Sequence, residues 1–258
     1  MSTTLGHEAF GTGARKVFVL NDWIGDTSSW DSARPYLDVS TFTWVFTDLR
    51  GYGRSKALTG SFNVEESAAD VLALADSLGV QRFTIVGHSM STLIALHLAQ
   101  HAPARIERAI AITPPPRTGF GADDDRIAAM QGLARGDDAR RLSGLRYMLG
   151  DRQAEGFLRF KAQRWRDSAD PEAVAAYVPM FARRGLPDPA ARIEVPVLAI
   201  TGELDSEPMR CAPVTASLAV ICARLTVAPF EDCGHYPMQE MPPMLVAAVE
   251  RFLGARGE

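Results

Sequence analysis

Short apolar runs alternate with helical patterns along most of this chain. The runs that indicate buried strands are 16–21, 43–49, 82–87, 107–113, 195–201 and 223–230. Helical spacing of apolar residues follows several of them, at 63–80, at 92–102 and at roughly 240–254. Strands that are apolar throughout must be covered on both faces, and a helix between two strands makes those strands parallel. The alternation therefore predicts an α/β fold with a mostly parallel central sheet and helices on both faces.

The alternation is interrupted once, between Arg117 and Ala191. This segment contains no convincing strand, and it is rich in Arg, Asp, Ala, Gly and Met. Apolar residues recur at helical spacing in 126–134 and in 154–165. We therefore expect a helical cap at 117–191, inserted into a core formed by residues 1–116 and 192–258.

Composition excludes several classes of protein. Hydrophobic residues make up 47% of the 258 positions, which is enough for one large core. The formal net charge is −4 and there is no basic stripe, so we expect no nucleic-acid partner. The N-terminus lacks the pattern of a signal peptide, and no apolar run is long enough to span a membrane. A cytoplasmic location is the expectation, and the sequence leaves open whether the protein is a monomer or a homodimer.

The three cysteines, Cys211, Cys222 and Cys233, do not indicate a metal site or a disulfide framework. They show no CxxC spacing, and no histidines accompany them at zinc-ligand spacing. Nucleotide-binding loops of the GxGxxG and GxxxxGK[ST] types are also absent. We therefore expect neither a metal nor an organic cofactor.

A serine stands at the corner between a strand and a helix in the stretch FTIVGHSMSTLIALHLAQ, residues 83–100. Such a turn typically exposes a nucleophilic hydroxyl, here that of Ser89, above the carboxyl ends of the strands. The backbone N–H of Met90 would then point toward a developing oxyanion. Small residues are required two positions before and after the serine, where Gly87 and Ser91 stand. The simpler alternative is that Ser89 only caps a buried helix.

A serine nucleophile needs a base, and the base needs an acid to orient it. His235 follows the last predicted strand, and Asp205 follows the strand before it by a short turn. Glu231 and Asp232 are rival acids, and Asp205 has an alternative role as a helix cap. The chain order Ser89, Asp205, His235 favours a catalytic triad.

Three further motifs resemble the α/β-hydrolase superfamily, over nearly the whole chain. These are DLRGYGRS at 48–55, TGELD at 201–205 and CGHYPMQEMP at 233–242. The resemblance implies the α/β-hydrolase fold, no cofactor, and the backbone N–H of Trp23 as the second oxyanion donor.

One departure from the family pattern lies beside Trp23. Many relatives carry His-Gly where this chain has Asn21 and Asp22. Enol-lactone hydrolases of the superfamily show a similar Asn-for-His replacement. A carboxylate aimed at an oxyanion would oppose it, so we expect Asp22 to point away into a local turn hydrogen bond. The alternative is that Asp22 contacts the substrate.

These features together predict a serine hydrolase that cleaves a carboxylic ester or lactone of a small, largely apolar substrate through an acyl-enzyme. The candidates for the substrate pocket are Asn21, Asp22, His88, Tyr147, Met148, Trp165, Met180 and Tyr236.

Other activities of the same fold stay open. A perhydrolase or a carbon–carbon bond hydrolase would share the triad. Cofactor-free dioxygenases usually place the acid after an earlier strand, where this chain reads ITPPPRTG at 112–119. A slow-turnover sensor that signals to a protein partner is a further alternative.

Overall fold

The computed structural model describes residues 4–150 and 152–254. Within these residues the strands form one sheet of seven, in the order β1-β3-β2-β4-β5-β6-β7. All six predicted strands are present, and every neighbouring pair among them is parallel. Their bounds are β2 Arg15–Leu20, β3 Phe42–Thr47, β4 Phe83–His88, β5 Ile106–Ile112, β6 Val197–Gly202 and β7 Leu225–Phe230. The predicted fold class is therefore confirmed.

The remaining strand, β1 at His7–Phe10, was not predicted. It pairs antiparallel with β3 at the edge of the sheet. The strand has four residues and none of them is fully buried. A strand this short and this exposed carries too little apolar pattern to be recognised in a sequence.

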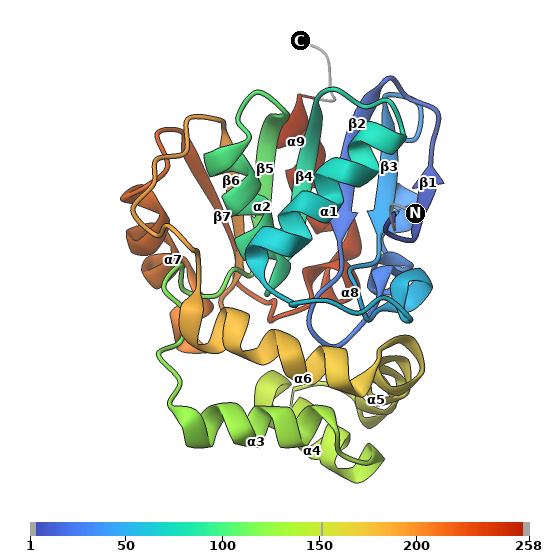
Figure 1. Ribbon diagram of the computed structural model, residues 1–258, viewed down its shortest axis with the longest axis vertical. Coiled ribbons are helices and arrows are strands. Elements are labelled where there is room, and N and C mark those ends of the chain that lie inside the picture. The colour runs from blue at the N-terminus through green and yellow to red at the C-terminus, as the bar shows by residue number, and fades with distance from the viewer. Residues whose placement is uncertain (1–3, 151, 255–258) are drawn as a thin grey trace.

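Helices cover both faces of the sheet. Figure 1 shows α1 (Val64–Ser77) and α2 (Ser91–His101) in front of the sheet and α9 (Pro242–Leu253) behind it. Helix α1 starts where predicted because Asn63 caps it, its side chain accepting from the N–H of Glu66 at 2.8 Å. Helix α2 is buried along most of its length, as its apolar sequence requires. Two shorter helices, α7 (Cys211–Ala219) and α8 (Pro237–Glu240), precede and follow β7.

A layer of helices lies below the sheet in Figure 1, formed by the segment after β5. It contains α3 (Asp124–Ala134), α4 (Asp138–Leu149), α5 (Glu155–Ser168) and α6 (Pro171–Pro179), and a π-helical turn, η4, at Met180–Arg184. We call this layer the cap. Three of these helices, α3, α4 and α6, begin at an aspartate whose side chain accepts from backbone N–H groups of the first turn. These aspartates are Asp123, Asp137 and Asp170. The division into a core and a cap domain stays a prediction, and residues 1–3, 151 and 255–258 of the predicted domains lie outside the described residues.

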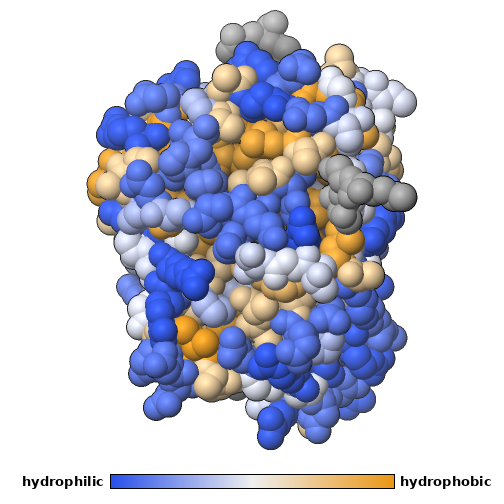
Figure 2. Space-filling view, in the orientation of Figure 1, coloured by the Kyte–Doolittle hydropathy of each residue, from blue (hydrophilic) through white to orange (hydrophobic). Residues whose placement is uncertain are grey.

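The outer surface of the face in Figure 1 is mostly hydrophilic, over the sheet helices as well as over the cap (Figure 2). Most apolar side chains of α5 and α6 instead turn inward, with Leu158, Trp165 and Val174 among the buried residues, although Phe160 stays exposed. The cap therefore packs its apolar side onto the loops at the carboxyl ends of the strands. Among the described residues, no helix is both long and apolar enough to cross a bilayer.

Candidate active site

A cavity of about 650 Å³ lies between the carboxyl ends of the strands and the cap. Ser89, Asp205 and His235 all line it, although 146 residues separate the first of them from the last. Ser89 follows β4, Asp205 follows β6 and His235 follows β7, so the parallel sheet delivers all three to one edge. The cavity volume is typical of a site for a small organic molecule.

The turn at Ser89 is strained. Ser89 has a φ of 53°, in the left-handed region that residues with a side chain rarely adopt. Its N–H is fixed by the carbonyl of Ile112 at 2.9 Å. A Cβ at Gly87 would come within 2.4 Å of the backbone oxygen of Ser91, so only glycine fits there. Backbone strain that the surrounding structure enforces is common at active sites, and this turn has that form.

Ser91, which stands where many relatives have glycine, has a structural use. Its hydroxyl accepts from the N–H of His88 at 2.9 Å and donates to the carbonyl of His88 at 3.0 Å. The side chain is fully buried. Ser91 therefore bridges the two sides of the turn that carries Ser89.

The half-buried His235 and the buried Asp205 form a pair. The distance from Nδ1 of His235 to Oδ2 of Asp205 is 2.7 Å, and the other oxygen of Asp205 accepts from the N–H of Ser206 at 2.7 Å. Burial favours the neutral carboxyl, but the charge of His235 and the hydrogen bonds from His235 and Ser206 together hold the pKa of Asp205 below its ordinary value. Burial likewise opposes the imidazolium, and Asp205 overcomes this and raises the pKa of His235. The Nδ1 contact leaves Nε2 of His235 as the nitrogen that can exchange a proton with another group.

The rival acids take no part in this pair. Glu231 and Asp232 make no hydrogen bond to His235 among the described residues. A third carboxylate, Glu240, instead fixes the histidine loop by accepting from the N–H groups of Gly234 and Tyr236, each at 2.9 Å.

Two backbone N–H groups near Ser89 are not used by the protein's own hydrogen bonds among the described residues. No hydrogen bond among the described residues uses the N–H of Met90, at the start of α2, or that of Trp23. Trp23 is held firmly from other sides. Its indole Nε1 donates to the carbonyl of Val174 on α6 at 2.8 Å, and its own carbonyl accepts from the hydroxyl of Tyr52 at 2.7 Å.

Asn21 supports the same loop from within. Its amide donates to the carbonyls of Asp22 and Gly25, at 2.8 and 3.0 Å, and its oxygen accepts from the N–H of Leu49 at 2.8 Å. Asp22 does not adopt a positive φ, so the family's glycine is not needed at this position. The loop therefore keeps its form without the His-Gly pair.

The side chain of Asp22 does not make the local turn bond that we expected. Its Oδ2 accepts from the hydroxyl of Tyr236 at 2.8 Å, across 214 residues of sequence. Asp22 and Tyr236 both line the cavity, so the carboxylate does not point away from the site. The expectation is wrong because it considered only partners near in sequence, whereas Tyr236 reaches Asp22 from the histidine loop.

The other pocket candidates divide into two groups. Tyr147 and Met148 line the cavity, and Tyr147 is 89% exposed at its rim. Asn21, His88, Trp165 and Met180 lie behind the wall rather than on it, because they are buried against the loops and helices that form it. His88 donates from Nε2 to the carbonyl of His235 at 2.7 Å, and burial lowers its pKa to about 4, so it is neutral.

Lys161 of α5, a buried cation beside this site, was not predicted from the sequence. Its Nζ lies 3.6 Å from the centre of the Tyr236 ring, and the residue is 1% exposed. The signal was present in the sequence. Lys161 stands on the helix face that Leu158, Ala162 and Trp165 bury, where an apolar residue belongs.

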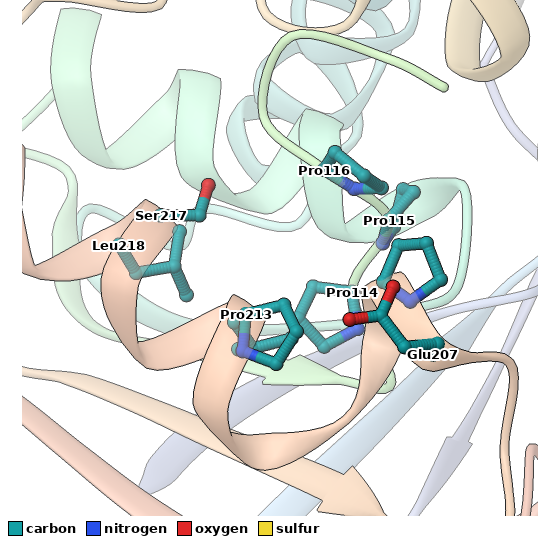
Figure 3. Close-up of a pocket in the computed structure, with 9 residues that line it drawn as sticks. Pro114, Pro115, Pro116, Glu207, Pro213, Ser217 and Leu218 are labelled. Atoms are coloured by element: carbon teal, nitrogen blue, oxygen red, sulfur yellow. The ribbon is translucent and has the colours of Figure 1, made fainter.

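Two other hollows adjoin the cavity. An open groove between α3 and α4 shares Ala129, Leu133, Gly144 and Tyr147 with the cavity wall, so the cavity opens between these helices. A small pocket of about 140 Å³ faces α7, and Figure 3 shows the prolines 114–116 of the loop after β5 lining it. Its one ionisable side chain among the lining residues is Glu207, and it holds no nucleophile–base pair.

A parallel sheet that carries a serine on a sharp strand-to-helix turn, with a histidine–carboxylate pair from later loops, defines the α/β-hydrolase class. The family model for the alpha/beta hydrolase fold matches residues 17–238, and the chain belongs to that family.

Individual relatives have several activities. A 2-heptyl-3-hydroxy-4(1H)-quinolone dioxygenase of Mycobacteroides abscessus is 33% identical over 123 residues, which are 45% of this chain and 43% of that protein. A 3-oxoadipate enol-lactonase 2 of Acinetobacter baylyi is 28% identical over 116 residues, with the same shares of the two chains. The matched region thus spans less than half the length of either relative. The crystal structure of the enol-lactonase from Burkholderia xenovorans superposes with a TM-score of 0.83 over 96% of each chain, at 24% identity.

Proposed function

We propose that this protein is a serine hydrolase that cleaves a carboxylic ester or a lactone through an acyl-enzyme. Ser89 attacks the carbonyl carbon while Nε2 of His235 takes the hydroxyl proton, and Asp205 stabilises the resulting imidazolium. The N–H groups of Met90 and Trp23 bind the oxyanion. A donor of this kind typically contributes about 10²–10³ in rate. His235 then gives its proton to the leaving oxygen and activates the water that releases the acid.

The observation that carries the proposal is the His235–Asp205 contact of 2.7 Å in the cavity that the strained Ser89 lines. A structural serine at a helix start does not need a left-handed φ, nor an imidazole–carboxylate pair in the same cavity. The similarity to an enol-lactonase, at 28% identity over 45% of the chain, supports ester or lactone chemistry.

The cavity favours a largely apolar substrate. Away from the proposed catalytic residues its wall is mainly apolar, with Ile24, Phe120, Met130, Leu133, Met148 and Phe181 among the lining side chains. Such a wall gains free energy by burying alkyl or aryl groups, at about 25 cal/mol per Å² of apolar surface. Small alkanoate esters and aryl esters are therefore suitable first substrates.

A fluorophosphonate probe tests the proposal directly. We expect it to label Ser89, and we expect Ser89→Ala to lose both the labelling and the hydrolysis of 4-nitrophenyl butyrate. Ser206→Ala is the matched control, because Ser206 lines the same cavity but only its backbone N–H contacts Asp205. Ester hydrolysis that persists at the wild-type rate in Ser89→Ala would refute the proposal.

Cofactor-free dioxygenation is the second candidate, because a quinolone dioxygenase is 33% identical over 45% of the chain. A dioxygenase of this kind needs a base but no acyl-enzyme. Oxygen consumption with a 3-hydroxy-4(1H)-quinolone that continues in Ser89→Ala would favour this candidate. Ester hydrolysis without oxygen consumption would favour the hydrolase.

A further inference from the structure

One oxygen of Asp22 has no partner in a site where an unpartnered charge is costly. Asp22 is 1% exposed and lines the cavity together with Ser89 and His235. Its Oδ2 accepts from Tyr236, but its Oδ1 is buried and has no hydrogen-bond partner among the described residues. A buried acceptor without a donor destabilises a protein, so the position requires an explanation.

The surroundings keep Asp22 ionised, and thus an acceptor only. Burial is the largest influence and alone would raise the pKa of Asp22, but the positive charge of Lys161, together with smaller contributions that include the hydrogen bond from Tyr236, holds that pKa below its ordinary value. Burial lowers the pKa of Lys161 to about 8, which still leaves the ammonium mostly protonated at neutral pH. Burial also raises the pKa of Tyr236, so the phenol stays protonated and donates a hydrogen bond to Asp22.

Asp22 lies close to the proposed reacting groups on two sides. It directly precedes Trp23, whose N–H is a proposed oxyanion donor. Its hydrogen-bonding partner Tyr236 directly follows His235, and the two rings lie 5.2 Å apart between centres. A negative charge here opposes an oxyanion, so Asp22 does not serve the carbonyl oxygen itself. The part of the substrate next to the carbonyl is the part that Asp22, as a lining residue beside these groups, could meet.

We propose that Oδ1 of Asp22 accepts a hydrogen bond from a hydroxyl or N–H group on the α or β carbon of the acyl part of the substrate. The preferred substrates are then esters or lactones of hydroxy or amino-substituted acids rather than plain alkanoates. This inference rests on the proposed function, because it places the acyl carbonyl at Ser89. It explains why a carboxylate replaces the family's glycine beside an oxyanion donor.

Boronic acids that form an adduct with a reactive serine test the inference without the natural substrate. Butylboronic acid has no donor, 1-acetamidobutylboronic acid has an N–H next to boron, and its N-methyl analogue fills the space without the N–H. A hydrogen bond to a charged group typically contributes about 1.5–3 kcal/mol, which is about 10–100-fold in affinity. We expect the N–H compound to bind the wild-type protein that much more tightly than its N-methyl analogue, by isothermal titration calorimetry.

The Asp22→Asn variant should remove or reverse the preference for the N–H compound over its N-methyl analogue. Tyr236 would donate to the amide oxygen, which turns the amide NH₂ to the position of Oδ1, so a donor on the ligand would meet another donor. The 10–100-fold preference should therefore fall to about one or invert. Asp232→Asn is the matched control, because this exposed carboxylate lies three residues from His235 and does not line the cavity. It should keep the wild-type preference.

The outcomes separate the two proposals. If none of the boronic acids binds the wild-type protein, the serine hydrolase proposal fails. If all three bind the wild type with equal affinity, or if Asp22→Asn keeps the preference for N–H, only the role of Asp22 is refuted, and a bound water satisfies Oδ1 instead. The comparison within the wild-type protein needs no variant, so it stands even if Asp22→Asn does not fold.

Discussion

Replacing Ser91 by alanine should destabilise the turn that carries Ser89. The hydroxyl of Ser91 makes two hydrogen bonds with the backbone of His88, at 2.9 and 3.0 Å, and both residues are at most 1% exposed. Without it the N–H of His88 loses its partner where water cannot reach, at a cost of about 1–3 kcal/mol, and the second bond adds about 1 kcal/mol. The free energy of unfolding should therefore fall by about 2–4 kcal/mol.

Thermal unfolding followed by circular dichroism measures this loss. For a chain of this size each kcal/mol lowers the midpoint by about 2–4 °C, so Ser91→Ala should unfold about 4–16 °C earlier than the wild type. Ser143→Ala, an exposed serine on α4, is the control and should change stability by less than about 0.5 kcal/mol. A midpoint for Ser91→Ala equal to that of the control would refute the claim that the hydroxyl bridges the turn.

Four further predictions concern the site. Because Asp205 raises the pKa of His235 above its ordinary 6.5, and only the neutral imidazole accepts a proton, kcat/KM should fall on the acid side with a midpoint above pH 6.5. Asp205→Asn should lower kcat by about 10⁴-fold, and an unchanged pH–rate profile would contradict this assignment. Gly87→Ala places a Cβ 2.4 Å from a backbone oxygen, so the thermal midpoint and ester turnover should both fall, at a cost of about 1–3 kcal/mol. Trp23→Phe leaves the carbonyl of Val174 unpartnered and should reduce kcat more than it changes KM in steady-state assays; a change in KM alone would argue against the oxyanion role.

The sheet could be predicted because the apolar residues that mark a strand lie next to one another in the sequence. The parallel strands are largely apolar, and the inner strands β4 and β6 are buried at every position, so for these two the pattern in the sequence matches the burial in the structure. The helices α4 and α6 of the cap could not be found in the same way. Helix α4 buries only Arg141, Leu145 and Leu149, and α6 is a nine-residue helix with a proline at each end, so neither shows a long helical pattern of apolar residues.

The candidate site was predicted in part. Ser89, Asp205 and His235 follow strands of one parallel sheet, and chain order alone places such residues at a common edge. The interaction of Asp22 with Tyr236 and Lys161 could not be derived, because the three residues come from three distant loops and helices. A lysine on the apolar face of α5 is the one local sign that a buried anion lies opposite.

The indole of Trp23 connects the loop that carries a proposed oxyanion donor to helix α6 of the cap. Its bond to the carbonyl of Val174 fastens the loop with the proposed oxyanion donor to α6, so a movement that lifts α6 from the sheet would also release that donor. The groove between α3 and α4 shares part of its lining with the cavity and does not involve α6, so a ligand that entered from that side would leave the loop of Trp23 in place.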